Sequence, residues 1–299
     1  MADQDVYWRL ADHLHHLGMG YPVTEALVEI LKENYIPLEA EIALAVPTGI
    51  VPLEVAGIDE ILEHVELSKP ELAEILERLT EKKLLFSAKT KDGQDGYALH
   101  QVGFGFPQSF FWSGEDTPHG RKMAGMIAKY FNRHVTAEAY AAETKAFRYI
   151  PVGQSLTPEL QAVYPLHLME PVIENAQLIA VAHCPCRVAY RLAGKGCEHP
   201  TEVCLKFDEM ARYVIDHGLA REITKQEALD IIKMTEEAGL VHFGDNSEGE
   251  IKHNCNCCGC ACWNVGNIRR RKIPRDLIMA TYFIRETDED VCTECGECV

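Results

Sequence analysis

Apolar residues recur at helical spacing in the first part of the chain. One such segment runs from Val6 to Leu17 and another from Thr24 to Glu33. The hydroxyl of Thr24 stands where it can accept a hydrogen bond from the first turn of the second segment, which marks a helix start. The pattern therefore predicts two helices in an N-terminal region that covers residues 1–56.

The pattern of residues 57–100 predicts two helices followed by a hairpin. Ser68 and Glu71 form a capping box at the start of the second helix, and the run 89–96 places turn-forming residues between two short apolar segments. This order of elements resembles a winged helix-turn-helix module. In DNA-binding modules of this kind, the second helix enters the major groove.

That second helix has an unfavourable charge pattern for nucleic acid. Apart from Lys69 at its start, its basic residues Arg78, Lys82 and Lys83 lie near its end, and its acidic residues are Glu71, Glu74, Glu77 and Glu81. Carboxylates repel the phosphate backbone. A scaffold or protein-contact role is therefore favoured for the winged-helix-like module, and a nucleic-acid partner is not expected.

Residues 101–177 form an aromatic connecting region, for which burial in a core is the default interpretation. The apolar run Leu178–Ala182 then predicts a buried strand, and helical patterns follow at Phe207–His217 and Thr224–Ala238. These elements belong to a last region, residues 178–299. The fold class predicted from the elements is α+β and rich in helix.

Length and charge narrow the class of protein. The 299 residues include 47% hydrophobic residues and carry a formal net charge of −17. A chain of this length is expected to form two or three compact units. The first residues lack the basic and apolar segments of a secretory signal, and no apolar stretch reaches the roughly 20 residues of a membrane span. A cytoplasmic location is therefore expected.

All twelve cysteines lie from Cys184 onward. Cysteines that only fill a core would be scattered, whereas the ligands of one inorganic centre cluster in the sequence. The first group consists of Cys184, Cys186, Cys197 and Cys204. Four thiolates are the full ligand set of a four-iron four-sulfur cluster, so this group is predicted to hold one.

A second, denser group consists of Cys255, Cys257, Cys258, Cys260 and Cys262. In an extended segment alternate residues face the same side. That alternation predicts Cys258, Cys260 and Cys262 on one side, with Cys257 on the other. The second group is therefore able to serve two centres.

The third group consists of Cys292, Cys295 and Cys298. It matches the first three positions of the ferredoxin run C-x2-C-x2-C-x3-C-P, whose fourth cysteine would fall beyond Val299. Either the motif is cut short, or the fifth cysteine of the second group completes the third set. The count predicts two or three four-iron four-sulfur clusters per chain.

Two other uses of the cysteines compete with this interpretation. Zinc prefers C-x2-C pairs, which occur here in the third group and, overlapping, within the dense second group, and a disulfide framework is improbable without export. The spacing therefore favours iron–sulfur clusters.

The cysteine segments also resemble those of a known family, the ferredoxin-type four-iron four-sulfur proteins of anaerobic bacteria and archaea. The resemblance is carried by Cys184-Pro185-Cys186-Arg187, Gly196-Cys197, Cys204-Leu205-Lys206-Phe207, Asn254–Cys260 and the run from Cys292. It implies a ferredoxin-like iron–sulfur domain behind the winged-helix-like module. Members usually continue into complete ferredoxin motifs, whereas this sequence ends within one.

The sequence shows no nicotinamide, flavin or nucleotide fingerprint, so electrons are expected to pass between protein redox partners. An electron carrier is favoured over a stand-alone enzyme, and no catalytic residue is assigned. Two alternatives stay open: a cluster-sensing winged-helix regulator, and an enzyme with an open iron site near His183, His199 or His253. A basic run could dock a partner, namely Arg269, Arg270, Arg271 and Lys272. The oligomeric state is left open.

Overall fold

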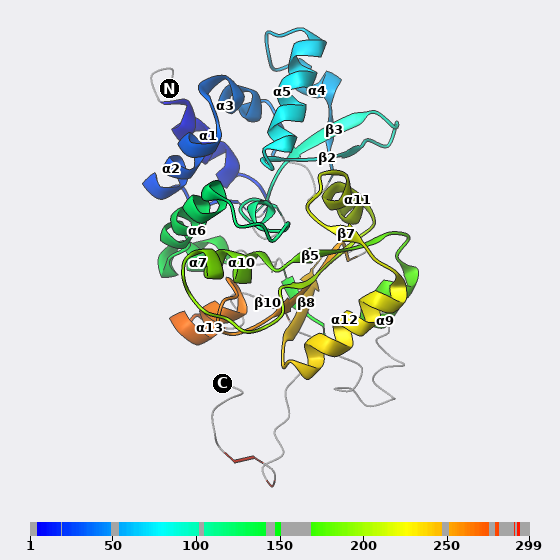
Figure 1. Ribbon diagram of the computed structural model, residues 1–299. Coiled ribbons are helices and arrows are strands. Elements are labelled where there is room, and N and C mark those ends of the chain that lie inside the picture. The colour runs from blue at the N-terminus through cyan, green and yellow to red at the C-terminus, as the bar shows by residue number, and fades with distance from the viewer. Residues whose placement is uncertain are drawn as a thin grey trace.

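The computed structural model shows a mixed α/β fold. Figure 1 shows the helices of the N-terminal half above a sheet that belongs to the C-terminal half. The structure describes residues 5–18, 20–48, 54–101, 105–141, 147–150, 169–246, 251–274, 279–280, 290 and 292–293.

Three helices open the chain: α1 (Val6–His15), α2 (Glu25–Asn34) and α3 (Pro37–Leu44). The Leu27 N–H donates to the Thr24 hydroxyl at 3.2 Å, which confirms the predicted cap. Buried leucines of α1 and α2 belong to one apolar core together with residues of α5 and α6. The two helices predicted for this region are therefore confirmed, and α3 is an additional one.

The next elements are β1 (Ala56–Gly57), α4 (Ile58–Leu62), α5 (Lys69–Glu81), β2 (Leu85–Lys89) and β3 (Asp95–Leu99). The strands form an antiparallel sheet in the order β1-β3-β2. At the start of α5, the Ser68 N–H donates to the Glu71 carboxylate at 2.9 Å. The predicted helices, capping box and hairpin are confirmed, and the assignment to the winged-helix family stays a prediction.

The exposed face of α5 is acidic, as its sequence indicates. All four of its predicted glutamates are exposed. Two of the few basic residues nearby form ion pairs within the protein. Arg78 and Lys82 bind the buried carboxylate of Glu39 at 3.0 Å and 2.7 Å. This arrangement leaves little positive charge on α5 to attract phosphate.

The connecting region contains a short 3₁₀ turn, η1 (Gln108–Phe110), followed by α6 (Pro118–Tyr130) and α7 (Arg133–Ala139). Its aromatic residues Phe111 and Trp112 are fully buried, as expected for a core. Helix α6 packs against α2 on one side and against α10 (Pro185–Leu192) on the other. It therefore joins the N-terminal helices to the cysteine-rich part.

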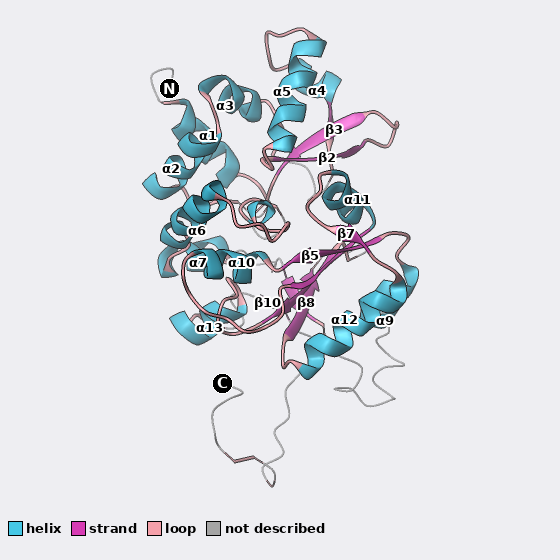
Figure 2. Ribbon diagram, viewed as in Figure 1, coloured by secondary structure: helices cyan, strands magenta, loops and turns pink. Residues whose placement is uncertain are grey.

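The cysteine-rich part is built on a second sheet, drawn in magenta in Figure 2. Its described strands run in the order β10-β4-β8-β9-β6-β5-β7 and pair antiparallel, except that β10 is parallel to β4. The strands are β4 (Phe147–Tyr149), β5 (Ile179–His183), β6 (Glu202–Phe207), β7 (Arg221–Glu222), β8 (Val241–Asp245), β9 (His253–Cys257) and β10 (Met279–Ala280).

Helices α9 (Met169–Asn175), α11 (Asp208–Asp216) and α12 (Lys225–Glu237) accompany this sheet, and α13 (Val265–Arg271) follows the second cysteine group. The predicted strand at Leu178–Ala182 and the predicted helices that became α11 and α12 are confirmed within one or two residues. The α+β fold class is compatible with this architecture. The ferredoxin-like assignment of the domain stays a prediction.

Over the residues that the structure describes, no helix is both long and apolar enough to cross a membrane.

Candidate metal centres

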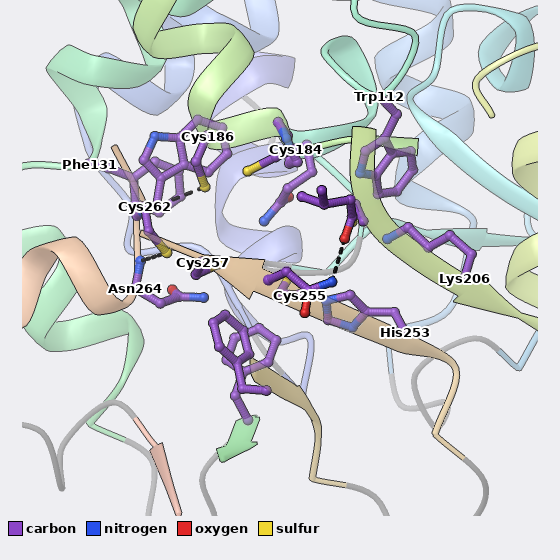
Figure 3. A pocket seen from close by; sticks show the side chains of 18 of the residues that line it. Trp112, Phe131, Cys184, Cys186, Lys206, His253, Cys255, Cys257, Cys262 and Asn264 are labelled. Carbon is purple, nitrogen blue, oxygen red and sulfur yellow. Dashed lines mark hydrogen bonds between the residues drawn. The ribbon is translucent and has the colours of Figure 1, made fainter. Parts of the chain in front are cut away.

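Six cysteine thiols from four chain segments converge on one cavity, called here the six-thiol chamber. Figure 3 labels five of them around the cavity, which has a volume of about 30 Å³. Five of the six residues are buried and Cys255 is half-buried. The members are Cys184, Cys186, Cys204, Cys255, Cys257 and Cys262.

Strand pairing explains how these thiols meet. In the sheet, β6 lies between β5 and β9, so Cys204 stands opposite Ala182 on one side and its neighbour Leu205 stands opposite Asn254 on the other. Cys255 and Cys257 are two residues apart on β9 and therefore project to the same face. Cys184 and Cys186 follow β5, at the N-terminal end of α10.

The thiols of the chamber contact one another in a continuous chain. Cys186 contacts Cys184 and Cys262, and Cys257 contacts Cys262 and Cys255. Cys204 contacts Cys255 and is the last member of this open series. Such a set offers more ligands than the four that one iron–sulfur cluster requires.

Hydrogen-bond donors point at three of these sulfurs. The backbone N–H of Trp263 donates to Cys186 Sγ and that of Asn264 donates to Cys262 Sγ, both at 3.3 Å. The ring nitrogen Nε2 of His253 lies 3.0 Å from Cys255 Sγ. Donors at these positions stabilise negative charge on sulfur.

Two buried basic residues lie at the chamber, since Lys206 lines it and Arg187 follows its member Cys186. Lys206 and Arg187 are 1% and 0% exposed, although long cationic side chains are almost never fully buried without an anionic partner. The Lys206 ammonium lies 4.3 Å from the ring centre of Trp112, and it also acts on the charge of Cys204. These residues imply substantial negative charge inside the chamber.

The pKa values of the thiols diverge. Burial raises the pKa of Cys186 well above the usual range, and the contact with Cys255 does the same for Cys204 and Cys257. The contacts with Cys204 and Cys257 lower the pKa of Cys255. Protonated thiols must lose their protons before they bind a metal, so loading of the chamber is expected to release protons and to strengthen as the pH rises.

An aromatic wall lines part of the chamber. It includes Trp112, Phe131, Tyr140, Phe147 and Phe243. Within the part of the chain that the structure describes, the buried Trp112 Nε1 and Arg187 Nε have no hydrogen-bond partner. Buried donors without a partner are costly in an apolar site, and an anionic group bound in the chamber would supply acceptors.

A second constellation lies beside the chamber and is called here the Cys₃His group. Its ligand atoms all lie within 4.8 Å of one another, and its members are Cys197, His199, Cys258 and Cys260. The separations between its sulfurs are 3.1 Å, 3.2 Å and 3.7 Å. The cysteine-rich region can therefore hold a metal ion at this position.

The tertiary structure regroups the first two cysteine sets of the sequence. Cys197 does not lie with the other members of the first group; it contacts Cys258 and Cys260 instead. The second group divides between the two constellations, Cys255, Cys257 and Cys262 in the chamber and Cys258 and Cys260 in the Cys₃His group. The predicted alternation is wrong, however, because β9 ends at Cys257 and a turn follows, which returns Cys262 to the chamber.

The remaining predicted site residues have separate positions. Cys292 is exposed, whereas Cys295 and Cys298 lie outside the described residues. His183 bonds to the Thr201 hydroxyl rather than to a thiol. Of the basic run, Arg270 donates to the carbonyls of Gly259, Cys260 and Cys262, and Arg271 donates to Thr136.

Sequence reasoning missed the buried cations of the chamber. The signal for Lys206 was available, because it is a lysine between two apolar residues, Leu205 and Phe207, in a strand that also carries Cys204. Arg187 directly follows Cys186, and the sequence motif Cys184-Pro185-Cys186-Arg187 did not indicate that its side chain is buried.

Comparison with known proteins gives no further guide to this site. No protein-family model, no curated protein and no solved structure shows a significant match to the chain.

Proposed function

We propose that this chain is an electron-transfer protein whose six-thiol chamber holds an iron–sulfur cluster. The observation that supports this proposal most is the convergence of six thiols, five of them in buried residues, beside the buried cations Lys206 and Arg187. A bound cluster would supply one-electron exchange at a potential set by its surroundings. The chemistry of the donors fits such a group, because the described residues that line the chamber include no carboxylate and iron–sulfur clusters select thiolates.

The chain's own residues would tune that exchange. The N–H groups of Trp263 and Asn264, together with the Lys206 ammonium, favour added negative charge at the sulfurs. The aromatic wall excludes water and keeps these electrostatic effects strong. The result is a site in which the reduced, more negative state is stabilised.

The number of centres proposed is smaller than the ligand count of the sequence suggests. Among the described residues, the chamber is the one place where four or more thiols converge. Four of its six thiols would complete a four-iron four-sulfur cluster, and two would be spare. We therefore propose one such cluster in the described part, where the sequence alone predicts two or three.

Electrons would enter or leave near α13. This helix begins directly after the chamber residues Trp263 and Asn264 and ends at Arg271, and both Arg269 and the capping residue Lys272 are exposed. A positive patch on a chain of net charge −17 would steer an acidic redox partner to this end of the site. Electron exchange with such a partner should slow as the salt concentration rises, measured by stopped-flow absorbance, because ions screen exposed charges.

The central test is anaerobic purification followed by counting of iron and acid-labile sulfide. We expect about four atoms of each per chain, a brown protein, and an electron paramagnetic resonance signal that appears on reduction and disappears on reoxidation. A folded protein that carries no iron when expressed and purified under iron-replete, anaerobic conditions would overturn the proposal.

A further inference from the structure

The Cys₃His group has the dimensions of a site for a single ion. Zinc bonds of about 2.3 Å to sulfur and about 2.0–2.1 Å to nitrogen place the corners of a regular tetrahedron about 3.8 Å apart for two sulfurs and about 3.6 Å apart for sulfur and nitrogen. The sulfurs here are 3.1–3.7 Å apart, and His199 Nδ1 lies 3.6 Å and 3.7 Å from two of them.

A four-iron cluster would demand wider spacing. Each of its thiolates binds a different iron at a corner of the cube, so the four sulfurs point away from one another across the whole cluster. In the Cys₃His group every ligand atom lies within 4.8 Å of every other, whereas the chamber thiols contact one another only in an open series around a cavity. The compactness of the group therefore indicates one ion.

The ligand loops are fixed by two arginines. Arg191 donates to the carbonyl of Cys197 at 2.7 Å and to that of His199 at 2.9 Å. Arg270 donates to the carbonyl of Gly259 at 3.1 Å, within the turn that carries the other two ligands. Such bonds hold ligands in place before a metal arrives, which raises metal affinity.

The Cys₃His group packs in a different core cluster from the chamber, and a buried arginine lies between the two sites. Cys197 and Cys258 belong to a small core cluster with Leu240 and Ala261, whereas most of the chamber cysteines pack in other clusters. The guanidinium of Arg187 lies between the two sites, since it bonds to Cys258 and also acts on the charge of Cys184. It would offset the net negative charge of three thiolates around a divalent cation.

We infer that Cys197, His199, Cys258 and Cys260 form a closed, four-coordinate zinc site that is distinct from the iron–sulfur chamber. Zinc has no redox chemistry and takes four protein ligands in structural sites. The ion would fasten the loop after α10 to the turn after β9. This inference does not depend on the proposed function, because the zinc site stands whether or not the chamber holds iron.

The test measures zinc and iron together in the full-length protein after anaerobic purification. We expect about one zinc per chain, at least a tenfold loss of zinc in Cys260→Ser, and retention of iron in that variant. The matched control Glu198→Gln changes an exposed residue between two ligands and should keep both metals. Conversely, simultaneous substitution of Cys255, Cys257 and Cys262 by serine should lose iron and keep zinc.

A second variant distinguishes loss of a zinc ligand from misfolding of the protein. His199→Cys should still bind one zinc, and X-ray absorption at the zinc edge should change from three sulfurs and one nitrogen to four sulfurs. Absence of zinc from the wild-type protein, iron at this position, or loss of iron rather than zinc from Cys260→Ser would overturn the assignment.

Discussion

Replacement of Cys255, Cys257 and Cys262 by serine should remove the iron–sulfur cluster from the protein. The triple variant leaves three thiols in the six-thiol chamber, and a four-iron four-sulfur cluster requires four cysteine ligands. We expect the iron content to fall at least tenfold, measured by elemental analysis of anaerobically purified protein. The charge-transfer absorbance and the resonance signal of the reduced protein should disappear with it.

This triple variant should also unfold more easily. Metal binding is coupled to folding, and the chamber would keep the buried charges of Lys206 and Arg187 without the anionic group that offsets them. We expect a loss of several kcal/mol in the free energy of unfolding, measured by chemical denaturation.

The control is a double variant, Cys258→Ser with Cys260→Ser. It removes two cysteines from the same dense group of the sequence, but both belong to the Cys₃His group and not to the chamber. Its iron content should stay near that of the wild type. Equal iron loss in both variants would show that the division of the second group between two sites is wrong.

The second large effect concerns the reduction potential. Lys206→Met removes a buried positive charge beside Cys204 while it keeps a side chain of similar length. A nearby positive charge favours the reduced state, so its removal should lower the potential. At an effective dielectric constant of about 20, one charge several ångströms away contributes about 2–3 kcal/mol, which corresponds to a shift on the order of 100 mV for one electron.

The measurement is a redox titration followed by electron paramagnetic resonance. Lys206→Arg keeps the charge and should shift the potential much less. Lys233→Met removes a charge from the exposed surface of α12 and should leave the potential unchanged, because solvent and salt screen that position. If Lys206→Met leaves the potential where it is, then Lys206 does not act on the redox centre.

Local features of the fold could be read from the sequence because they depend on neighbouring residues. The cap at Thr24 and the capping box of Ser68 and Glu71 satisfy backbone N–H groups within three residues of themselves. The apolar run that became β5 also follows from its own composition. Such signals need no knowledge of the rest of the chain.

The assignment of cysteines to sites could not be read in the same way. Cys186 and Cys197 are close in sequence, but α10 occupies most of the chain between them, and its end at Leu192 lies about 9 Å along the helix from Cys186 at 1.5 Å per residue. Cys197 therefore meets Cys258 and Cys260, which are distant in sequence. Similarly, the turn after Cys257 breaks the alternation that an extended strand would have imposed.

The sequence by itself determined that this protein concentrates its cysteines in one region and offers thiolate chemistry there, because residue types and local spacing are properties of the chain. Only the tertiary structure decided which thiols share a site and which cations face them. The pairing of β6 with β5 and β9 brings Cys204 to Cys255, and it buries Lys206 among them. Those contacts join residues about fifty positions apart, where no local pattern records them.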